Sequence, residues 1–419
     1  MARWYDRLYE VKAALRPNIL GREDMSDHLK EAHVRLLYPA LLGRDAGLAD
    51  VDHHVAHSRT VGEFLEILLA SEEYAARNPT ACSASEPLLA NLWHPDLAEW
   101  THPVGSRSAD DVAIVGREGW VFLRGGSNKF VPQFSGALQM EHDWLGRWQD
   151  LIAQRRREAD ALGVHVASLV VPEKMAIMLE QYPEPLIPVG PRPIERLLEA
   201  GLPIGYPLQA LRTAAAEDPV CLRTDSHLTI RGNAVLNAGL LAELGAAPIV
   251  LDELPASRSY VSSGDLGSRF APRVLEVTST TASLGIAELV EDNWADITRA
   301  GGHIGTRRVF RSPGAPDPRT VILFGDSYGF AAESYQGTAW FLAQAFRETH
   351  FVWAPFGWDP GYVEQVGADV VVSETAERFV ARVPMDRVDV SALAAEAEAK
   401  GTFVAVDDIF ADVPHSDLA

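Results

Sequence analysis

The chain has 419 residues, of which 47% are hydrophobic and 23% are charged, and these values are typical of globular proteins. Its formal net charge is −21, which argues against nucleic acid or an anionic membrane surface as the main partner. Cys82 and Cys221 lie far apart without a C-x-x-C pattern, so neither a disulfide framework nor a cysteine-built metal site is indicated.

The first residues, MARWYDRLYEVKAALRPNILGRED, carry charges every few positions and contain no apolar segment of the signal-peptide type. No later run approaches the roughly 18 apolar residues that a membrane-spanning helix needs. We therefore expect a cytoplasmic protein without direct membrane insertion, or a periplasmic one if the natural chain carries a leader that this sequence lacks.

Residues 1–80 are expected to form a helical module. Apolar residues recur at helical spacing within 26–78, and Thr60 occupies an N-cap position with Glu63 three residues further on. The segments LLGRDAG and FLEILLASEEY resemble a small helical domain that is attached to surface-layer, haemolysin-like and glycan-related bacterial proteins. Two interpretations stay open: docking to a protein partner, or a packing appendage without one.

Neither a metal nor a resident cofactor is expected. His53, His54 and His57 lie close together, but no fourth ligand at a metal-site spacing accompanies them. The sequence contains neither a P-loop nor a G-x-G-x-x-G motif after a predicted strand, so nucleotide-driven chemistry is not indicated.

The remaining chain divides into a predicted linker (81–110), an α/β domain (111–390) and a C-terminal extension (391–419). Segments of helical length separate the later apolar runs of the α/β domain, which predicts a parallel sheet covered by helices on both faces. The four predicted buried strands are VHVASLVVP (164–172), TVILFGDS (320–327), HFVWAP (350–355) and ADVVVSE (368–374). Ligands of such sheets bind beyond the carboxyl ends of the strands, which is where Ser327 falls.

Ser327 is a candidate nucleophile, and a serine hydroxyl needs a base with an orienting group behind it. Asp225 and His227 stand two residues apart, and in a local turn such a carboxylate can hold the imidazole Nδ1 while the other nitrogen takes the serine proton. The alternative is that Asp225 caps the helix predicted after it and that His227 is a surface residue.

Acyl transfer also needs hydrogen-bond donors for the oxyanion. We expect one from the backbone N–H of Ser327, placed at the start of a helix where the helix dipole would support it, with Asp326 as the cap of that helix. A second donor is expected from the glycine-rich loop FLRGGSNKF, through Gly126 or Asn128.

GDSY after a strand resembles block I of the SGNH (GDSL-type) hydrolases. The order, with D-S-H about 100 residues before the serine, resembles the alginate O-acetyltransferase branch of that superfamily. Four further segments are similar to motifs of this branch: GREGWVFLRGGSN, LVVPEK, SGDLG and ADVVVSETAERF. The resemblance covers roughly residues 110–385. It implies a flavodoxin-like three-layer α/β/α fold, with Ser327 as nucleophile, His227 as general base and then acid, and Asp225 as the orienting carboxylate.

The resemblance further implies an acetyl-serine intermediate and a carbohydrate hydroxyl as acceptor. This chain has Leu228 where the branch usually has an aromatic residue, and Ile230 where a proline is frequent. The acetyl donor is open, with acetyl-CoA as one candidate, and alginate itself is not expected as the acceptor. A carbohydrate O-acetyl esterase and a non-catalytic glycan-binding or scaffold protein of polysaccharide biosynthesis are the alternatives.

Several other residues are candidates for substrate contact or for packing. Lys174, Arg231 and Tyr328 are candidates for substrate binding, and for Lys174 and Arg231 a structural role is the alternative. An ion-pair network at the last strand is expected from Glu374, Glu377 and Arg378. Four aromatic residues are candidates for sugar stacking, with core packing expected for at least half of them: Tyr335, Trp340, Trp353 and Trp358.

Overall fold

The computed structural model describes residues 34, 38, 46–58, 64, 67, 68, 71, 73, 102–126, 128–249, 257–262, 264–270, 274, 276–281, 284–299, 302–332, 335–393 and 395. Most of the predicted helical module, with Thr60 and Glu63, lies outside the described residues, as do most of the predicted linker and C-terminal extension. The domain boundaries therefore stay predictions. Within the module, helix α4 (Leu48–His57) buries His54, whose Nε2 lies 2.8 Å from the hydroxyl of Tyr38.

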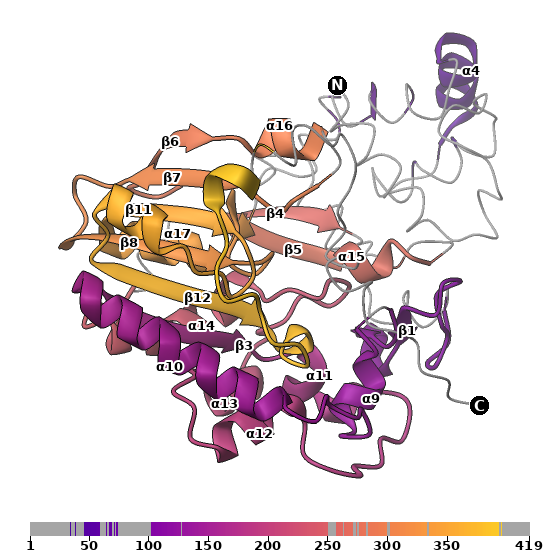
Figure 1. The fold of residues 1–419 in the computed structure, drawn as a ribbon. Helices are drawn as coiled ribbons and strands as arrows, with labels where there is room; N and C mark the ends of the chain where they lie inside the picture. The colour runs from indigo at the N-terminus through magenta and orange to yellow at the C-terminus, as the bar shows by residue number, and fades with distance from the viewer. Residues whose placement is uncertain are drawn as a thin grey trace.

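The centre of the fold is a six-stranded sheet with the strand order β3-β12-β8-β11-β7-β6 (Figure 1). All four predicted strands are present, as β3, β8, β11 and β12, and they pair in parallel. The strands span His165–Val171 (β3), Val370–Ala376 (β12), Asp317–Gly325 (β8), Phe346–Trp353 (β11), Arg307–Arg311 (β7) and Glu288–Asp292 (β6). The expected parallel sheet is thus confirmed for its central four strands, while β7 and β6 extend one edge in antiparallel orientation.

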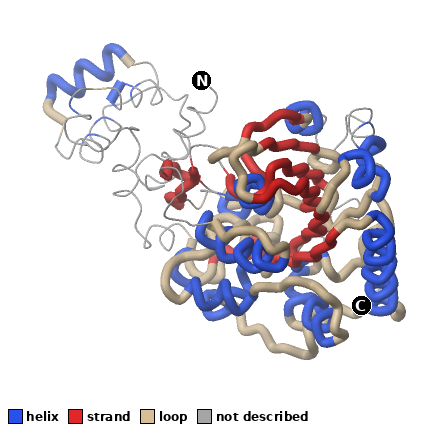
Figure 2. Tube along the Cα trace, turned by 90° about the vertical axis from the view of Figure 1, so that its left-hand side faces the viewer, coloured by secondary structure: helices blue, strands red, loops and turns tan. Residues whose placement is uncertain are grey.

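Alternate side chains of the parallel strands enter two separate cores, as the period of two in a strand requires. Val321 and Leu323 of β8 pack in the core that also contains side chains of α14 (Ile230–Glu243) and α17 (Thr338–Ala345). Ile322 and Phe324 face the opposite layer, to which α10 (Trp144–Leu162) and α18 (Pro360–Val366) contribute. Helices therefore cover both faces of the sheet, as Figure 2 shows, and the expected three-layer α/β/α fold is confirmed.

The other described elements are short and lie around this sandwich. The helices are α9 (Phe130–Phe134), α11 (Lys174–Ile177), α12 (Pro193–Glu199), α13 (Leu208–Ala215), α15 (Gly264–Gly267) and α16 (Trp294–Arg299). Three antiparallel pairs complete them: β1 (Ala113–Val115) with β2 (Val121–Leu123), β4 (Ser257–Ser262) with β5 (Glu276–Thr281), and β9 (Ala331–Ala332) with β10 (Tyr335–Gln336). Among the described residues, no helix is both long and apolar enough to span a bilayer.

The chain after β8 differs from the expectation. A turn and the β9–β10 hairpin follow Ser327, and helix α17 begins only at Thr338. The chain doubles back here, since the backbone N–H of Thr338 donates to the carbonyl of Tyr328 at 3.1 Å. Ser327 is therefore not at a helix N-terminus, so the expected support from a helix dipole is wrong, and so is the expectation that Asp326 caps a helix.

Candidate active site

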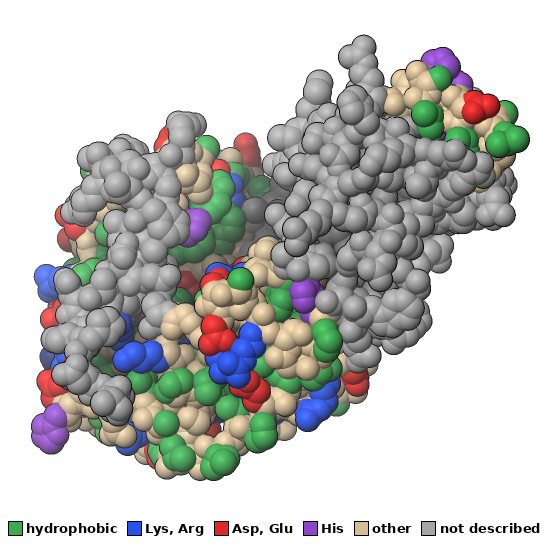
Figure 3. All heavy atoms as spheres, turned by 90° about the vertical axis from the view of Figure 1, so that its right-hand side faces the viewer, with side chains coloured by type: hydrophobic (Ala, Val, Ile, Leu, Met, Phe, Trp, Pro, Cys, Tyr) green, Lys and Arg blue, Asp and Glu red, His purple; other side chains and the backbone are tan. Residues whose placement is uncertain are grey.

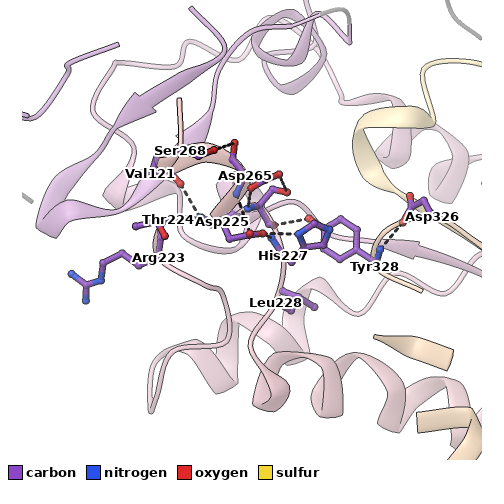
Figure 4. A network of polar contacts seen from close by, with 12 residues as sticks. Val121, Arg223, Thr224, Asp225, His227, Leu228, Asp265, Ser268, Asp326 and Tyr328 are labelled. Carbon is purple, nitrogen blue, oxygen red and sulfur yellow. Dashed lines mark hydrogen bonds and ion pairs between the residues drawn. The ribbon is translucent and has the colours of Figure 1, made fainter. Parts of the chain in front are cut away.

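The D-S-H segment forms a turn immediately before α14, and the helix has its own cap. The Thr229 side chain accepts a hydrogen bond from the backbone N–H of Gly232 at 3.0 Å, which is the N-cap interaction of α14. Asp225 instead accepts hydrogen bonds on Oδ1 from His227, from Nδ1 at 2.6 Å and from the backbone N–H at 2.9 Å (Figure 4). The helix-cap alternative for Asp225 is therefore wrong, and the carboxylate lies behind the imidazole.

Two acids from the β4–β5 region, the buried Glu276 and the exposed Asp265, hold this turn in place. The Glu276 carboxylate accepts hydrogen bonds from the backbone N–H and the hydroxyl of Thr224, at 2.9 and 2.8 Å. The Asp265 carboxylate accepts from the backbone N–H and the hydroxyl of Ser226, both at 2.6 Å. Gly264 is needed beside Asp265, because a Cβ there would lie 2.5 Å from the Asp225 Cβ. The carboxylate–imidazole pair is thus held by contacts with a distant segment.

Tyr328 joins the histidine turn to the segment that carries Ser327. Its ring lies 4.7 Å from the His227 imidazole, centroid to centroid, and its hydroxyl donates to the Ser226 carbonyl at 2.7 Å (Figure 4). Tyr328 is fully buried, so both contacts are shielded from water. Because Ser327 precedes Tyr328 directly, the nucleophile candidate and the base candidate belong to one docked unit, although 100 residues separate them in the chain.

The turn after β8 is itself fixed by Asp326. One carboxylate oxygen accepts from the Tyr328 backbone N–H at 2.9 Å, and the other accepts from the Ala376 backbone N–H at 2.7 Å, at the end of β12. Ser327 between them is half-buried. Asp326 therefore has a structural role that differs from the expected one: it ties the serine turn to the neighbouring strand.

The charges of the pair favour a poised histidine. Burial by itself lowers the pKa of the His227 imidazole, but the Asp225 carboxylate more than offsets this, so the pKa lies above its ordinary value. Burial alone would raise the pKa of Asp225, but its contacts with His227 hold that pKa well below the usual range. Their side chains expose 18% and 19% of their areas, and the Nε2 atom of His227 is itself buried, so the pair is largely shielded from water.

Three of these side chains could also hold a metal ion, since ligand atoms of Asp225, His227 and Asp265 all lie within 4.8 Å of one another. The carboxylate oxygens are already used: those of Asp265 by Ser226, and those of Asp225 by His227 and by the Asp265 backbone N–H at 3.1 Å. A cation bound here would have to displace or share these hydrogen bonds.

Two other candidate binding residues, Lys174 and Arg231, make contacts of a structural kind. Lys174 is buried, and its ammonium donates to the backbone carbonyls of Val121 at 2.8 Å and of Arg223 at 3.2 Å, while burial lowers its pKa. Arg231 forms an ion pair with Glu217 at 2.9 Å on the surface, which is the structural alternative expected for it. Neither contact involves Ser327, and substrate binding by these two residues, and by Tyr328, stays a prediction.

The glycine-rich loop is connected to the same edge of the sheet. Gly126 is exposed at φ +86°, and the carbonyl of Asn128 accepts a hydrogen bond from the Gln133 side chain. The same amide nitrogen of Gln133 donates to the carbonyl of Arg378 at 2.9 Å. The loop is thus tied to the segment after β12, and its role in an oxyanion site stays a prediction.

The pairing of Arg378 with Glu173 was not expected from the sequence. The guanidinium lies 3.1 and 3.2 Å from the two Glu173 oxygens and 5.6 Å above the Tyr328 ring. Burial raises the pKa of Glu173 to about 7 although Arg378 opposes the shift. Each residue lies two positions after a strand, and the pairing of β3 with β12 in the sheet brings the two together. Glu377 pairs with Arg192 at 2.7 Å, whereas Glu374 has no ion pair among the described contacts, so the expected network is only partly present.

No family model and no curated protein matches the chain. Solved structures similar to it include a DHHW family protein from Eubacterium siraeum (15% identity, 59% of this chain and 88% of that one, TM-score 0.42) and the O-acetyltransferase domain of Pseudomonas putida AlgJ (16%, 68% and 99%, 0.40). Bacillus cereus PatB1 (10%, 67% and 98%, 0.46) and Pseudomonas aeruginosa AlgX (12%, 68% and 66%, 0.36) are also similar. All four TM-scores lie below 0.5 and all four identities below 25%.

Proposed function

We propose that this protein is an O-acetyltransferase that acts through an acyl-serine intermediate on a hydroxyl of a carbohydrate or sugar-containing molecule. The observation that carries the proposal is the docking of Tyr328 on the Asp225–His227 turn, with its ring 4.7 Å from the imidazole and its hydroxyl 2.7 Å from the Ser226 carbonyl. A serine nucleophile such as Ser327 needs a histidine backed by a carboxylate for its activation. Tyr328 would not need such a neighbour if its only role were to pack in the core.

In the proposed reaction the Ser327 Oγ attacks the carbonyl carbon of an acetyl donor, and its proton passes to Nε2 of His227. The donor's leaving group departs with that proton. The acceptor hydroxyl then attacks the acetyl-serine and gives its proton to Nε2, and Ser327 regains the proton as its ester bond breaks. Asp225 fixes the Nδ1–H tautomer and stabilises the imidazolium that forms in each step.

The choice of acetyl as the transferred group and of a sugar as the acceptor rests on the resemblance of the motifs described above. The donor is proposed as a class, an activated acetyl ester or thioester such as acetyl-CoA. Water in place of the sugar would give an acetyl esterase through the same intermediate, and a site without turnover would leave a glycan-binding or scaffold protein. A protein partner docked through the N-terminal segment is compatible with each of these.

The test is a chromogenic acetyl ester assay with and without added saccharides, together with intact-mass analysis of the protein. We expect ester turnover, a transient adduct of one acetyl group, and loss of both in the variant Ser327→Ala. Saccharide-dependent acceleration with an acetylated product supports transfer, and turnover without it supports the esterase. Turnover that survives in Ser327→Ala, or the absence of any adduct and turnover in the wild type, overturns the acyl-serine proposal.

A further inference from the structure

A cluster of aromatic side chains lies on the β11 side of the serine turn. The rings of Trp294, His303 and Trp353 are nearly parallel, with interplanar angles of 10–20° and centroids 4.8–5.9 Å apart. Phe330 packs against them, 4.7 Å from Trp294 and 5.7 Å from Trp353. We call these four residues the aromatic cluster. Trp353 is buried, whereas the other three members are half-buried and so keep part of their surface in contact with solvent.

The aromatic cluster adjoins the proposed nucleophile through the backbone. Trp353 at the end of β11 pairs in register with Gly325, two residues before Ser327. The next residue, Ala354, donates its N–H to the Gly325 carbonyl at 3.0 Å. Phe330 follows Ser327 by three positions. Figure 3 shows one face of the molecule with a hollow, beside which hydrophobic side chains and a histidine are exposed.

The two sides of the serine turn differ in chemistry. The β12 side carries the buried ions of Arg378 and Glu173, while the β11 side carries the aromatic cluster. On its rim, Asp292 forms a two-point ion pair with Arg308, whose guanidinium lies 4.9 Å from the Phe330 ring centre. Aromatic surfaces beside a few fixed polar groups are what a sugar ring requires, since its C–H faces stack on rings and its hydroxyls exchange hydrogen bonds at the edge.

The charges near the aromatic cluster restrict the kind of sugar. The two arginines at the start of β7, the end that lies beside Trp353 in the sheet, are already paired with carboxylates: Arg307 with Glu291 at 3.0 Å and Arg308 with Asp292 at 2.7 Å. The carboxylate of a uronate placed here would be repelled by these acids, because the arginines beside the cluster that the structure describes are already paired. Neutral or N-acetylated hexoses avoid that repulsion.

We propose that the aromatic cluster is the acceptor subsite, which binds a neutral or N-acetylated hexopyranose ring so that one of its hydroxyls reaches the acyl group on Ser327. This inference rests on the proposed function for its catalytic meaning, but the binding event does not depend on turnover. The alternative for the cluster is a purely stabilising aromatic packing with no ligand.

The binding experiment uses the full chain with Ser327→Ala, which cannot form the acyl-enzyme. Chitopentaose, cellopentaose and maltopentaose are titrated while tryptophan fluorescence and ligand-observed NMR are recorded, with pentamannuronate as the anionic comparison. At least one neutral saccharide should bind, and a further Trp294→Ala change should weaken that binding about tenfold. Trp294→Phe should restore part of it. Equal or tighter binding of pentamannuronate overturns the neutral specificity, and no binding of any neutral saccharide overturns the subsite.

The kinetic experiment measures the ratio of acetyl transfer to ester hydrolysis in the active protein. Trp294→Ala should lower this ratio about tenfold, chiefly through the KM for the saccharide. Ile286→Ala, an exposed residue just before β6, should leave the ratio unchanged. Saccharide binding that depends on Trp294 without any turnover would retain the subsite and reject the acetyltransferase. If the protein turns over and Trp294→Ala leaves the ratio of transfer to hydrolysis unchanged, the subsite is rejected while the acetyltransferase proposal stands. A lower melting temperature of the variant would not change this conclusion.

Discussion

Glu374 lies fully buried beneath the turn that carries Ser327, and it should make the stability of the protein depend on pH. A Cβ added to Gly329 would lie 2.7 Å from its Oε1, and one added to Gly325 would lie 3.2 Å away, so the two glycines of the turn leave room for this carboxyl. The Thr338 hydroxyl offers a contact that favours the charged form, but it falls short of hydrogen-bond geometry. Burial, followed by the nearby Asp326 carboxyl, raises the pKa of Glu374 well above 4.5.

The sign of the effect follows from proton linkage. In the unfolded chain Glu374 ionises above its ordinary pKa, whereas in the folded protein it keeps its proton to a higher pH. The stability that this difference contributes is therefore complete below the unfolded pKa and is lost as the pH rises through the folded one. Within that window the free energy of unfolding falls by about 1.4 kcal/mol for each pH unit. Glu374→Gln removes this contribution to the pH dependence of the unfolding free energy. The amide can also change the stability itself, but that change does not vary with pH.

The assay is urea denaturation followed by circular dichroism at a series of pH values from 5 to 8. The difference in unfolding free energy between wild type and Glu374→Gln should shrink or reverse in favour of the variant as the pH rises. Glu364→Gln, at an exposed position of α18, is the matched control and should follow the wild type. A wild-type-to-Gln difference that stays constant across this range would show that Glu374 is not held protonated in the folded state.

Three further predictions concern the proposed catalytic pair. Asp225→Asn should lower kcat by about 10³–10⁴-fold, and because it removes the carboxylate that raises the pKa of His227, the acid limb of the remaining activity should move to lower pH in a kcat–pH profile. Tyr328→Phe leaves the Ser226 carbonyl without its buried donor, which should cost about 1–3 kcal/mol of stability by chemical denaturation and should lower kcat more than it raises KM. Treatment with EDTA should leave ester turnover unchanged; a loss that a divalent cation restores would instead make Asp225, His227 and Asp265 a metal site.

The parallel core of the fold was predictable because strands buried on both faces appear in sequence as uninterrupted apolar runs. β8 and β12 are of this kind, and their side chains alternate between two cores. The edge strands were not predictable in the same way. β6, with the sequence ELVED, is largely exposed, and β7 begins and ends with arginines that pair with acids of its neighbours. Charged edge strands lack the apolar run, so their position becomes visible only when the partner strands are in place.

The candidate site likewise has one part that the sequence predicts and another part that it does not. The Asp225–His227 contact is local, with only Ser226 between the two residues, so the spacing made it one of the two interpretations that the sequence left open. The segment after Ser327 was predicted as a helix because it is apolar and of helical length, but its first part pairs with itself as the β9–β10 hairpin. The pairing of Glu173 with Arg378 required the knowledge that β3 and β12 are adjacent, which the sequence does not state.

The order of the motifs along the chain matters less for the chemistry than the contact that unites them. An Asp-x-His turn can form wherever the backbone allows it, and it becomes a base only when a nucleophile is brought beside it. In the proposed site that step would depend on Tyr328, which places its ring against the imidazole and its hydroxyl on the carbonyl between the aspartate and the histidine. Asp326 fixes the other side of the same turn to β12. A serine held from both sides in this way is positioned by the whole sheet, so the proposed site can be assembled only after β8 and β12 have paired and the histidine turn has docked.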